Sequence, residues 1–298
     1  MTLTVASSVD DIIEAMANGA RPIAGGTDLV VGSRQGKGSL PHTLIAIDRV
    51  AALSTIEQGP METRIGSGVT HSTAMTNATI VDHFTAIADA SALVGSPATR
   101  NVGTIGGNVM NGSPAMDTGS PLVVLGAQAE LTSSSGARLV ALDELWVGPG
   151  RTSATDDELC TALVIPNSKA GEGSAYVRLE YRRAMEIAIV GAAAAVTLDN
   201  GVLASIRVAL TAVAPTIIEI DGLDHLTGKP LDDTALDAVA SIASELASPI
   251  SDLRASDRYR RHTIGVMARR AVDAAARRAN GEHISVPVNR ALGVGASQ

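Results

Sequence analysis

The chain is poor in aromatic residues and in cysteine. It has 298 residues, among them one Trp, one Phe and three Tyr, and Cys160 is its only cysteine. So few aromatic rings exclude a nucleic-acid site built on base stacking. The net charge of −8 also argues against a nucleic-acid partner, because such partners are bound mainly through neutralisation of their phosphates. A single cysteine can form no intrachain disulfide, and it cannot ligate an iron–sulfur cluster without other chains.

Several sequence signatures are absent as well. The first five residues lack the charged and apolar regions of a signal peptide, and no apolar run approaches the length of a membrane span. We therefore expect a cytoplasmic protein, either free or associated with the inner face of the membrane. The six histidines show no H-x-x-x-H or H-E-x-x-H spacing, so no metal site is expected. There is no G-x-S-x-G elbow and no convincing acid–base pair, so no catalytic residue is assigned.

Apolar residues make up 45% of the chain, which is enough for a sizeable core of Ala, Val, Ile and Leu. Asp199-Asn200-Gly201, between two apolar runs, is a strong hairpin signal, and the polar stretch 169–174 predicts a domain boundary. Apolar spacing and turn signals together predict a succession of helices and strands. The predicted helices are 12–16, 29–34, 77–94, 234–246 and 259–280, and the predicted strands are 21–24, 43–47, 64–69, 122–132, 138–142, 158–165, 192–198 and 202–210.

Two short glycine turns are the most informative motifs. Ala24-Gly25-Gly26-Thr27-Asp28-Leu29 follows a predicted strand, and Thr104-Ile105-Gly106-Gly107-Asn108 comes later in the chain. Backbone amides approach diphosphate oxygens only where no Cβ atom intervenes, so glycine pairs suit such a ligand. One Gly-Gly pair usually only shapes a loop, and Thr27-Asp28 alone could serve as a helix cap. Two such turns with polar ends predict a shared diphosphate cradle, although G-x-G-x-x-G and G-x-x-x-x-G-K-[ST] do not occur.

The two turns belong to a series of motifs that extends over nearly the whole chain. The motifs lie at 24–29, 95–108, 111–117, 148–152, 213–216 and 254–261. In this order they resemble the flavoprotein (medium) subunits of molybdenum hydroxylases, the family of carbon monoxide dehydrogenase and xanthine dehydrogenase. The segment 95–108, G-S-P-A-T-R-N-V-G-T-I-G-G-N, is the most specific part of the resemblance.

The resemblance implies an α+β flavoprotein. Residues 1–170 would form a two-lobed FAD-binding α/β domain of the vanillyl-alcohol-oxidase/MurB-like type, with lobes of about 1–55 and 56–170. Residues 171–298 would form a C-terminal domain with an antiparallel sheet and helices. FAD is expected between the lobes, with its diphosphate on both glycine turns. Its isoalloxazine ring is expected to point toward the seam with the C-terminal domain.

The resemblance also implies a role in electron transfer. A large partner subunit would carry the molybdenum–pterin cofactor, and a small partner subunit would carry two 2Fe–2S clusters that deliver electrons to FAD. The terminal acceptor would be a quinone, NAD⁺ or oxygen, and the assembly a dimer of heterotrimers. The sequence does not name the substrate, since carbon monoxide, purines, N-heterocycles and aldehydes are all compatible with it.

The implied cofactor contacts extend beyond the turns. Asp117 would contact the ribityl chain or the ring, or it is an ordinary turn residue. Arg178 would lie near the N1–C2=O edge and stabilise the reduced flavin, or it is a solvated strand-edge arginine. Ile187 would pack over the isoalloxazine or belong to the core, and Cys160 would line the pocket as a small buried hydrophobe. The predicted cofactor-binding residues are Ala24, Gly25, Gly26, Thr27, Asp28, Leu29, Thr104, Ile105, Gly106, Gly107, Asn108, Asp117, Cys160, Arg178 and Ile187.

Two alternative functions remain open at this point. A stand-alone flavin oxidase of the vanillyl-alcohol-oxidase type usually needs a substrate pocket with tyrosines or a covalent flavin linkage. The chain has only three tyrosines and no histidine in or beside the glycine turns, so this alternative is disfavoured. A redox-inactive nucleotide-binding scaffold subunit is the other alternative. Arg269-Arg270 and Arg277-Arg278 repeat at helical spacing, and we expect them to form a solvated face, with a partner-docking face as the alternative.

Overall fold

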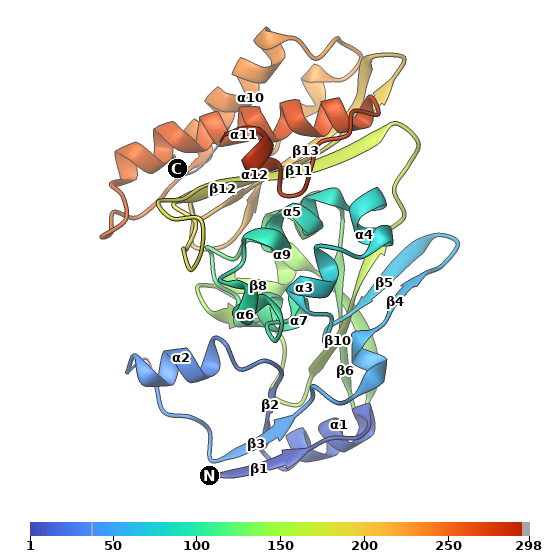
Figure 1. Cartoon of the computed structure of the whole chain (residues 1–298), viewed down its shortest axis with the longest axis vertical. Helices are drawn as coiled ribbons and strands as arrows, with labels where there is room; N and C mark the ends of the chain where they lie inside the picture. The colour runs from blue at the N-terminus through green and yellow to red at the C-terminus, as the bar shows by residue number, and fades with distance from the viewer. Residues whose placement is uncertain (37, 294–298) are drawn as a thin grey trace.

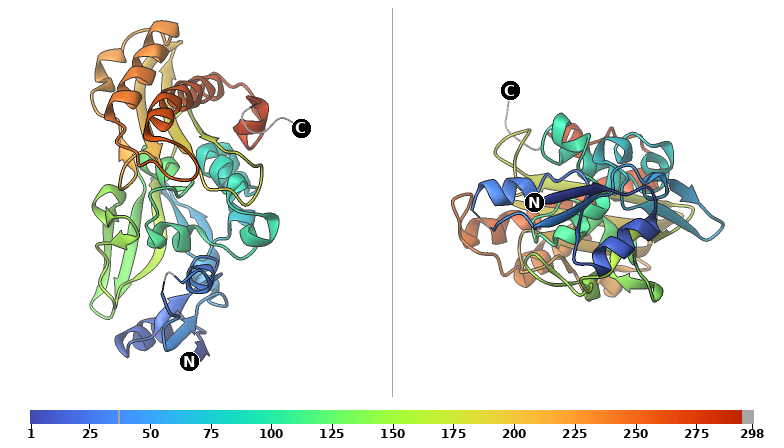
Figure 2. Two further views of the ribbon diagram at one scale, coloured as in Figure 1. Left: turned by 90° about the vertical axis from the view of Figure 1, so that its left-hand side faces the viewer. Right: turned by 90° about the horizontal axis from the view of Figure 1, so that it is seen from below.

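The computed structural model describes residues 1–36 and 38–293. The molecule is elongated, with a small N-terminal lobe at one end and the C-terminal sheet and helices at the other (Figure 1). A second lobe lies between these two parts, and the same order is seen when the molecule is turned (Figure 2). The order of the parts along the chain is therefore also their order in space.

The first lobe contains a three-stranded parallel sheet in the order β1-β3-β2. Ser8 begins the first helix through a capping box: its hydroxyl accepts from the Asp11 amide, and the Asp11 carboxylate accepts from the Ser8 amide, both at 3.1 Å. The predicted helices at 12–16 and 29–34 and the predicted strands at 21–24 and 43–47 are confirmed. The elements of this lobe are β1 (Thr2–Val5), α1 (Val9–Ala17), β2 (Arg21–Ile23), α2 (Leu29–Arg34) and β3 (Thr43–Ala46).

The second lobe combines a five-stranded antiparallel sheet, β4-β5-β10-β6-β7, with a group of short helices. These helices and the sheet enclose one apolar core. Its elements are η1 (Ala51–Ser54), β4 (Ile56–Gln58), β5 (Glu62–Gly66), α3 (His71–Ala74), α4 (Ala78–His83), α5 (Thr85–Leu93), α6 (Pro97–Arg100), α7 (Ile105–Asn111), α8 (Gly119–Val124), β6 (Gln128–Ser133), β7 (Gly136–Ala141), α9 (Leu142–Leu145), β8 (Trp146–Gly148), β9 (Arg151–Thr152) and β10 (Leu159–Pro166).

Two predicted elements in this lobe are wrong in part. The helix expected at 77–94 is divided into α4 and α5, because the buried Phe84 leaves the helical conformation with φ of −134° and ψ of 45°. The strand expected at 122–132 begins only at Gln128, since its apolar start belongs to α8. Gly126, with a φ of +71°, separates that helix from β6. A short buried apolar run has the same composition in a helix and in a strand, so periodicity could not distinguish them.

The C-terminal domain is an antiparallel sheet in the order β11-β12-β13-β14 with two long helices. The predicted hairpin around Asp199-Asn200-Gly201 and both predicted helices are confirmed. The elements are β11 (Glu172–Leu179), β12 (Val190–Asp199), β13 (Val202–Thr211), β14 (Ile218–Glu219), η2 (Leu223–Leu226), α10 (Asp233–Leu246), α11 (Asp257–Ala279) and α12 (Val288–Ala291).

Both faces of this sheet are covered. α11 packs on one face with α10 beside it, and α5 and α8 of the second lobe contact the other face. On β12, Ala192, Ala194 and Val196 face the core of the helices, whereas Ala193 and Ala195 face the core of the second lobe. Because successive side chains of a strand point to opposite faces, a strand buried on both sides reads as an uninterrupted apolar run.

A buried ion pair crosses the seam between the second lobe and the C-terminal domain. Asp89 of α5 is fully buried, and its Oδ2 lies 2.6 Å from Nη1 of Arg278, while its Oδ1 accepts from the Val288 amide at 2.8 Å. The solvated face expected for the paired arginines is therefore wrong at Arg278, whose side chain is 7% exposed. Arg269 pairs with surface carboxylates and keeps 37% exposure, as expected.

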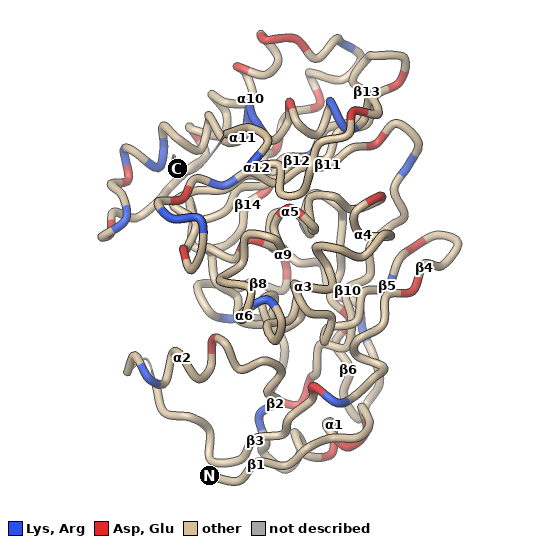
Figure 3. The backbone as a smooth tube through the Cα atoms, in the orientation of Figure 1, with Lys and Arg blue, Asp and Glu red and all other residues tan. Residues whose placement is uncertain are grey.

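Charged residues of both signs are interspersed along the described chain, without a long stretch of one sign (Figure 3). Over residues 1–36 and 38–293, no helix is long and apolar enough to cross a membrane.

Candidate functional site

The first glycine turn leaves the end of β2 and leads into α2. Gly26 has a φ of +66°, a left-handed conformation that glycine adopts without strain. Its carbonyl accepts the Val30 amide at 2.9 Å, where the helix begins. Among the residues that the structure describes, the amides of Gly25, Gly26 and Thr27 have no hydrogen-bond partner. The turn is partly exposed, so it presents neighbouring backbone donors to a ligand.

The second glycine turn forms the start of α7, and the amides of residues 105–108 all have acceptors inside the protein. A Cβ on Gly106 would lie 2.4 Å from the Cβ of Ser67, so this glycine is needed for packing. Gly107 is exposed, and the Asn108 side chain is partly exposed. These two residues are what this turn can offer a ligand directly. The acceptors of the four amides, at 2.9 to 3.0 Å, are the carbonyl oxygens of Val69, Ser67 and Thr104 and the Thr104 hydroxyl.

The two turns lie side by side, as the sequence predicts. A Cβ on Gly25 would lie 1.9 Å from the carbonyl oxygen of Val102 and 2.9 Å from the amide nitrogen of Gly103. The Cβ position of Gly103 in turn lies 3.5 Å from Oγ1 of Thr27. The first turn therefore rests on the two residues that immediately precede the second turn, and only glycine at position 25 permits this contact.

His71, at the start of α3, packs against the same junction. Its amide donates to the Gly103 carbonyl at 3.0 Å, and its Cδ2 lies 3.4 Å from the Cβ position of Gly103. Burial, helped by the nearby charge of Arg100, lowers the pKa of the His71 imidazole to about 4. The ring is therefore neutral at pH 7, and its Nδ1 lies 3.5 Å from the Ser91 hydroxyl.

Asp117 and Arg178, which belong to separate sequence motifs, form a buried ion pair. Nη1 of Arg178 donates to Oδ2 of Asp117 at 2.7 Å, and the Tyr176 hydroxyl donates to Oδ1 at 2.8 Å. Nε of Arg178 donates to Glu180 at 2.6 Å. Although burial opposes it, the two carboxylates raise the pKa of Arg178, so the guanidinium stays charged. Arg178 is 0% exposed, so the solvated strand-edge alternative is wrong, whereas Asp117 keeps 7% exposure.

Cys160 lies on β10 behind the second turn. It is 5% exposed, and burial raises the pKa of its thiol to about 12, which confirms the predicted small buried hydrophobe. The next residue, Thr161, accepts the amide of Ser67 at 3.0 Å, and Ser67 accepts the amide of Gly106. The cysteine is thus connected to the second turn through the backbone that supports it.

Ile187 lies on the loop 180–189, between β11 and β12. It is 48% exposed, so the simple core alternative is wrong. The loop returns to the second lobe, where the Met185 amide donates to the Gly95 carbonyl at 2.9 Å, and the Met185 sulfur lies 3.7 Å from the Thr99 hydroxyl. Ile187 therefore belongs to a loop of the C-terminal domain that contacts the segment just before the second glycine turn.

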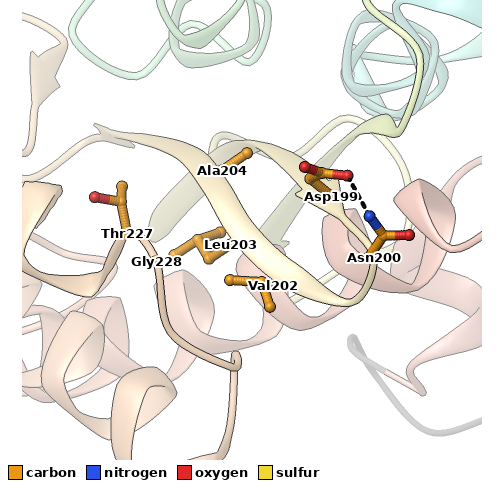
Figure 4. Close-up of a pocket in the computed structure, with 7 residues that line it drawn as sticks. All are labelled: Asp199, Asn200, Val202, Leu203, Ala204, Thr227 and Gly228. Carbon is orange, nitrogen blue, oxygen red and sulfur yellow. Dashed lines mark hydrogen bonds between the residues drawn. The ribbon is translucent and has the colours of Figure 1, made fainter.

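Two hollows of the described surface lie away from the glycine turns. The larger, of about 530 Å³, adjoins the β12–β13 hairpin, where the Asp199 carboxylate accepts from the Asn200 amide group at 2.9 Å (Figure 4). A second, of about 350 Å³, is lined by Ser256, Arg258, Tyr259 and His262 at the start of α11. Neither contains a predicted cofactor-binding residue. Within the described ranges, no three His, Cys, Asp or Glu side chains gather where they could hold a metal ion.

Three residues of the candidate site were not predicted from the sequence. Tyr176 lies two residues before Arg178 on β11, so these two side chains share one face of the strand, and Glu180 lies two residues after Arg178, directly past the end of the strand. The sequence S-A-Y-V-R-L-E contains this signal, because polar-tipped side chains alternate there with apolar ones. Val102 meets Gly25 through its backbone carbonyl, a contact for which side-chain patterns give no signal.

Known proteins share this architecture over nearly the whole chain. Residues 1–168 match the FAD binding domain in molybdopterin dehydrogenase, and residues 175–275 match the CO dehydrogenase flavoprotein C-terminal domain. The chain is 31% identical over 284 residues to the xanthine dehydrogenase FAD-binding subunit of Escherichia coli O157:H7, covering 93% of this chain and 96% of that one. It is 33% identical over 269 residues to the carbon monoxide dehydrogenase medium chain of Afipia carboxidovorans, covering 90% and 93%.

Solved structures of similar proteins have the same fold over nearly the whole chain. Carbon monoxide dehydrogenase from Hydrogenophaga pseudoflava matches with a TM-score of 0.88 at 28% identity, over 92% of this chain and 96% of that chain. Quinoline 2-oxidoreductase from Pseudomonas putida 86 matches with a TM-score of 0.86 at 26% identity, over 94% and 98%. The chain therefore belongs to the FAD-binding medium subunits of the molybdenum hydroxylase family, with a two-lobed FAD-binding domain followed by a CO dehydrogenase-type flavoprotein C-terminal domain.

Proposed function

We propose that this chain is the FAD-carrying electron-transfer subunit of a molybdenum hydroxylase complex. When bound, FAD supplies the redox chemistry that links the 2Fe–2S clusters of a small partner subunit to a terminal acceptor such as a quinone, NAD⁺ or oxygen. Substrate oxidation would occur on a large partner subunit with the molybdenum–pterin cofactor. The names of the similar proteins refer to xanthine, carbon monoxide and quinoline, so the substrate class is left open.

The first glycine turn carries this proposal. The amides of Gly25, Gly26 and Thr27 have no partner among the described residues, and a diphosphate has the acceptor oxygens that they need. The contact of Gly25 with Val102 fixes the turn, so the donors are oriented before a ligand arrives. We propose that these amides bind the diphosphate. The other predicted turn residues would complete the cradle: Ala24, Asp28, Leu29, Thr104, Ile105, Gly106, Gly107 and Asn108.

The isoalloxazine end of the cofactor would lie toward the C-terminal domain. Asp117 is the partly accessible member of the buried ion pair at this seam, and Ile187 is exposed on the loop that reaches back to the second lobe. We propose that these two side chains contact the flavin. Cys160 and Arg178 are buried, and we propose that they shape the site from behind.

The assembly is part of the same proposal. Relatives of this chain are named as FAD-binding subunits or medium chains of dehydrogenases, which supports a large and a small partner. We propose that these subunits assemble as a dimer of heterotrimers in the cytoplasm. The matched family segments end at 168 and begin again at 175, which supports a domain boundary near residue 170.

Isolation of the native complex through a tag on this chain tests the proposal. Acid precipitation should release FAD in a one-to-one ratio to the chain, and two other chains should co-purify with molybdenum and iron. A complex without FAD, or with flavin retained by the denatured chain, would contradict the proposal.

The same preparation distinguishes the alternative functions. A stand-alone oxidase predicts that the isolated chain consumes oxygen with an alcohol such as vanillyl alcohol. A redox-inactive scaffold predicts that anaerobic reduction of the intact complex by its oxidisable substrate bleaches no flavin band. The proposed subunit predicts reversible bleaching in the complex and no oxygen consumption by the isolated chain with that alcohol.

A further inference from the structure

We infer that Tyr176 and Arg178 are positioning residues, which hold the Asp117 carboxylate in the orientation in which it meets the flavin. This inference rests on the proposed function, because it takes Asp117 as a cofactor contact. It differs from the contact expected from the resemblance, in which Arg178 itself touches the ring. The structure provides separate observations on the carboxylate, on the guanidinium and on the hydroxyl.

The first observation is that both oxygens of the Asp117 carboxylate are bound from the same strand. Oδ1 accepts from the Tyr176 hydroxyl at 2.8 Å, and Oδ2 accepts from Nη1 of Arg178 at 2.7 Å. Two hydrogen bonds to different oxygens fix the plane of a carboxylate as well as its position. The Asp117 side chain is 10% exposed, and a carboxylate has more lone pairs than these two hydrogen bonds use, so it can still accept from a ligand.

The second observation is that Arg178 has no exposed surface and is held through its Nε, its Nη1 and its backbone. Its Nη2 has no hydrogen-bond partner among the described residues, but it lies 2.5 Å from the Glu180 carboxylate as an ion pair. Its Nε donates to Glu180 at 2.6 Å, its amide donates to Asn289 at 3.1 Å, and its carbonyl accepts from the same Asn289 side chain at 2.8 Å. Contact of the guanidinium with a ligand would require this network to open. Action through Asp117 requires no movement, so the geometry favours positioning over direct contact.

The third observation is that the sheet reserves space for the Tyr176 hydroxyl. Gly191 of β12 pairs with Arg178 of β11, and a Cβ on Gly191 would lie 2.5 Å from Oη of Tyr176. Any other residue at 191 would displace the hydroxyl from Asp117.

These contacts cross the seam between the two parts of the chain. Asp117 belongs to the FAD-binding domain, in the loop between α7 and α8, whereas Tyr176 and Arg178 belong to the C-terminal domain. The C-terminal domain would thus set the orientation of a carboxylate that the FAD-binding domain supplies to the cofactor. Flavin affinity and reduction potential should therefore respond to changes in β11.

The decisive experiment compares Tyr176→Phe, Arg178→Lys and the control Tyr259→Phe in the complete complex. Tyr176→Phe removes one hydroxyl and keeps the ring, and Arg178→Lys keeps the charge but cannot hold Asp117 and Glu180 with one planar fork. Tyr259 is 45% exposed, and within the described residues its hydroxyl has no hydrogen-bond partner. FAD dissociation constants, flavin reduction potentials and melting temperatures would be measured for each variant.

Tyr176→Phe should weaken FAD binding about 10-fold, the effect of losing one hydrogen bond to a charged group, and should shift the flavin potential. Arg178→Lys should weaken FAD binding at least as much and shift the potential in the same direction, and Tyr259→Phe should change neither. A lower melting temperature with unchanged affinity and potential would reduce both residues to a structural role and overturn the inference. An effect of Arg178→Lys without an effect of Tyr176→Phe would also overturn it, in favour of direct contact. Lack of FAD in the wild-type complex would instead contradict the proposed function itself.

Discussion

The two glycine turns look alike in sequence but differ in how their backbones are used. In the first turn, three neighbouring amides have no partner among the described residues, whereas in the second turn all four amides donate to protein acceptors. Both turns nevertheless depend on glycine for packing, Gly25 against Val102 and Gly106 against Ser67. The first turn is therefore suited to hold a ligand, and the second is suited to support the first.

This difference shows what a Gly-Gly pair can and cannot indicate. The lack of a Cβ allows close approach, but the approaching group can be a ligand or another part of the backbone. The two cases are distinguished by whether the neighbouring amides donate to protein acceptors. Buried backbone donors are almost always paired within the protein, whereas accessible ones need not be. Substitutions in each turn can test this distinction.

The largest effect is expected for Gly25→Ala. Even the smallest side chain would place a Cβ 1.9 Å from the Val102 carbonyl, so the backbone must move and the two turns must separate. We expect the variant to lose FAD, measured as the flavin that remains with the chain after gel filtration. Gly32→Ala is the matched control, because a Cβ on Gly32 has no neighbour within 4 Å. Full flavin retention by Gly25→Ala would show that the contact between the turns is not needed for binding.

The next largest effect is expected at acidic pH, where His71, which packs beside the second turn, should lower the stability of the fold. The pKa of His71 falls from 6.5 to about 4 on folding, so between these values the unfolded chain binds a proton that the folded chain does not. Stability should therefore fall as the pH is lowered from 6.5 to 4, by up to about 3 kcal/mol from this residue. Urea unfolding across this range should show the loss in the wild type, and it should be reduced in His71→Leu. His83→Leu, at an exposed histidine, should behave like the wild type; equal slopes in all three would contradict the prediction.

Local sequence signals predicted much of the fold because many elements have their own start and stop residues. The Ser8 capping box, the hairpin at Asp199-Asn200-Gly201 and the two C-terminal helices are of this kind. The errors arose where distant packing decides the outcome. Phe84 interrupts a helix because it is buried in the core of its lobe, and Arg278 is buried because Asp89, far away in sequence, lies opposite it.

The candidate site, like the fold, was predicted from the sequence only in part. The sequence predicted that the two turns meet, and the structure brings Gly25 onto Val102. The ion pair between Asp117 and Arg178 was not predicted, because the sequence does not show how the strands that carry the two motifs are placed relative to each other. Which of the two turns keeps its amides available also depends on backbone partners such as Ser67, and a sequence pattern does not contain them.

A smaller effect is expected for Gly106→Ala, which tests the structural role of the second turn. The new Cβ would lie 2.4 Å from the Cβ and 2.7 Å from the Cα of Ser67, so α7 and the segment that directly follows β5 must shift apart. We expect a loss of about 2 kcal/mol in unfolding free energy, typical of overpacking in a core. Urea unfolding would measure it, and FAD at saturating concentration should still bind. Loss of flavin from a chain of unchanged stability would mean that the second turn contacts the ligand more directly than its hydrogen bonds indicate.

The smallest effect is expected for Gly107→Ala, one residue further along the same turn. Its Cβ would meet only the Thr104 hydroxyl, at 3.0 Å, and the position is exposed and helical, where alanine is favoured over glycine. These two contributions oppose each other, so unfolding free energy should change by less than about 0.5 kcal/mol. FAD affinity is then the informative measurement. If Gly107 borders the bound diphosphate, the added methyl group should weaken binding without weakening the fold; unchanged affinity would confine the diphosphate to the first turn and exclude close approach of the ligand to this end of α7.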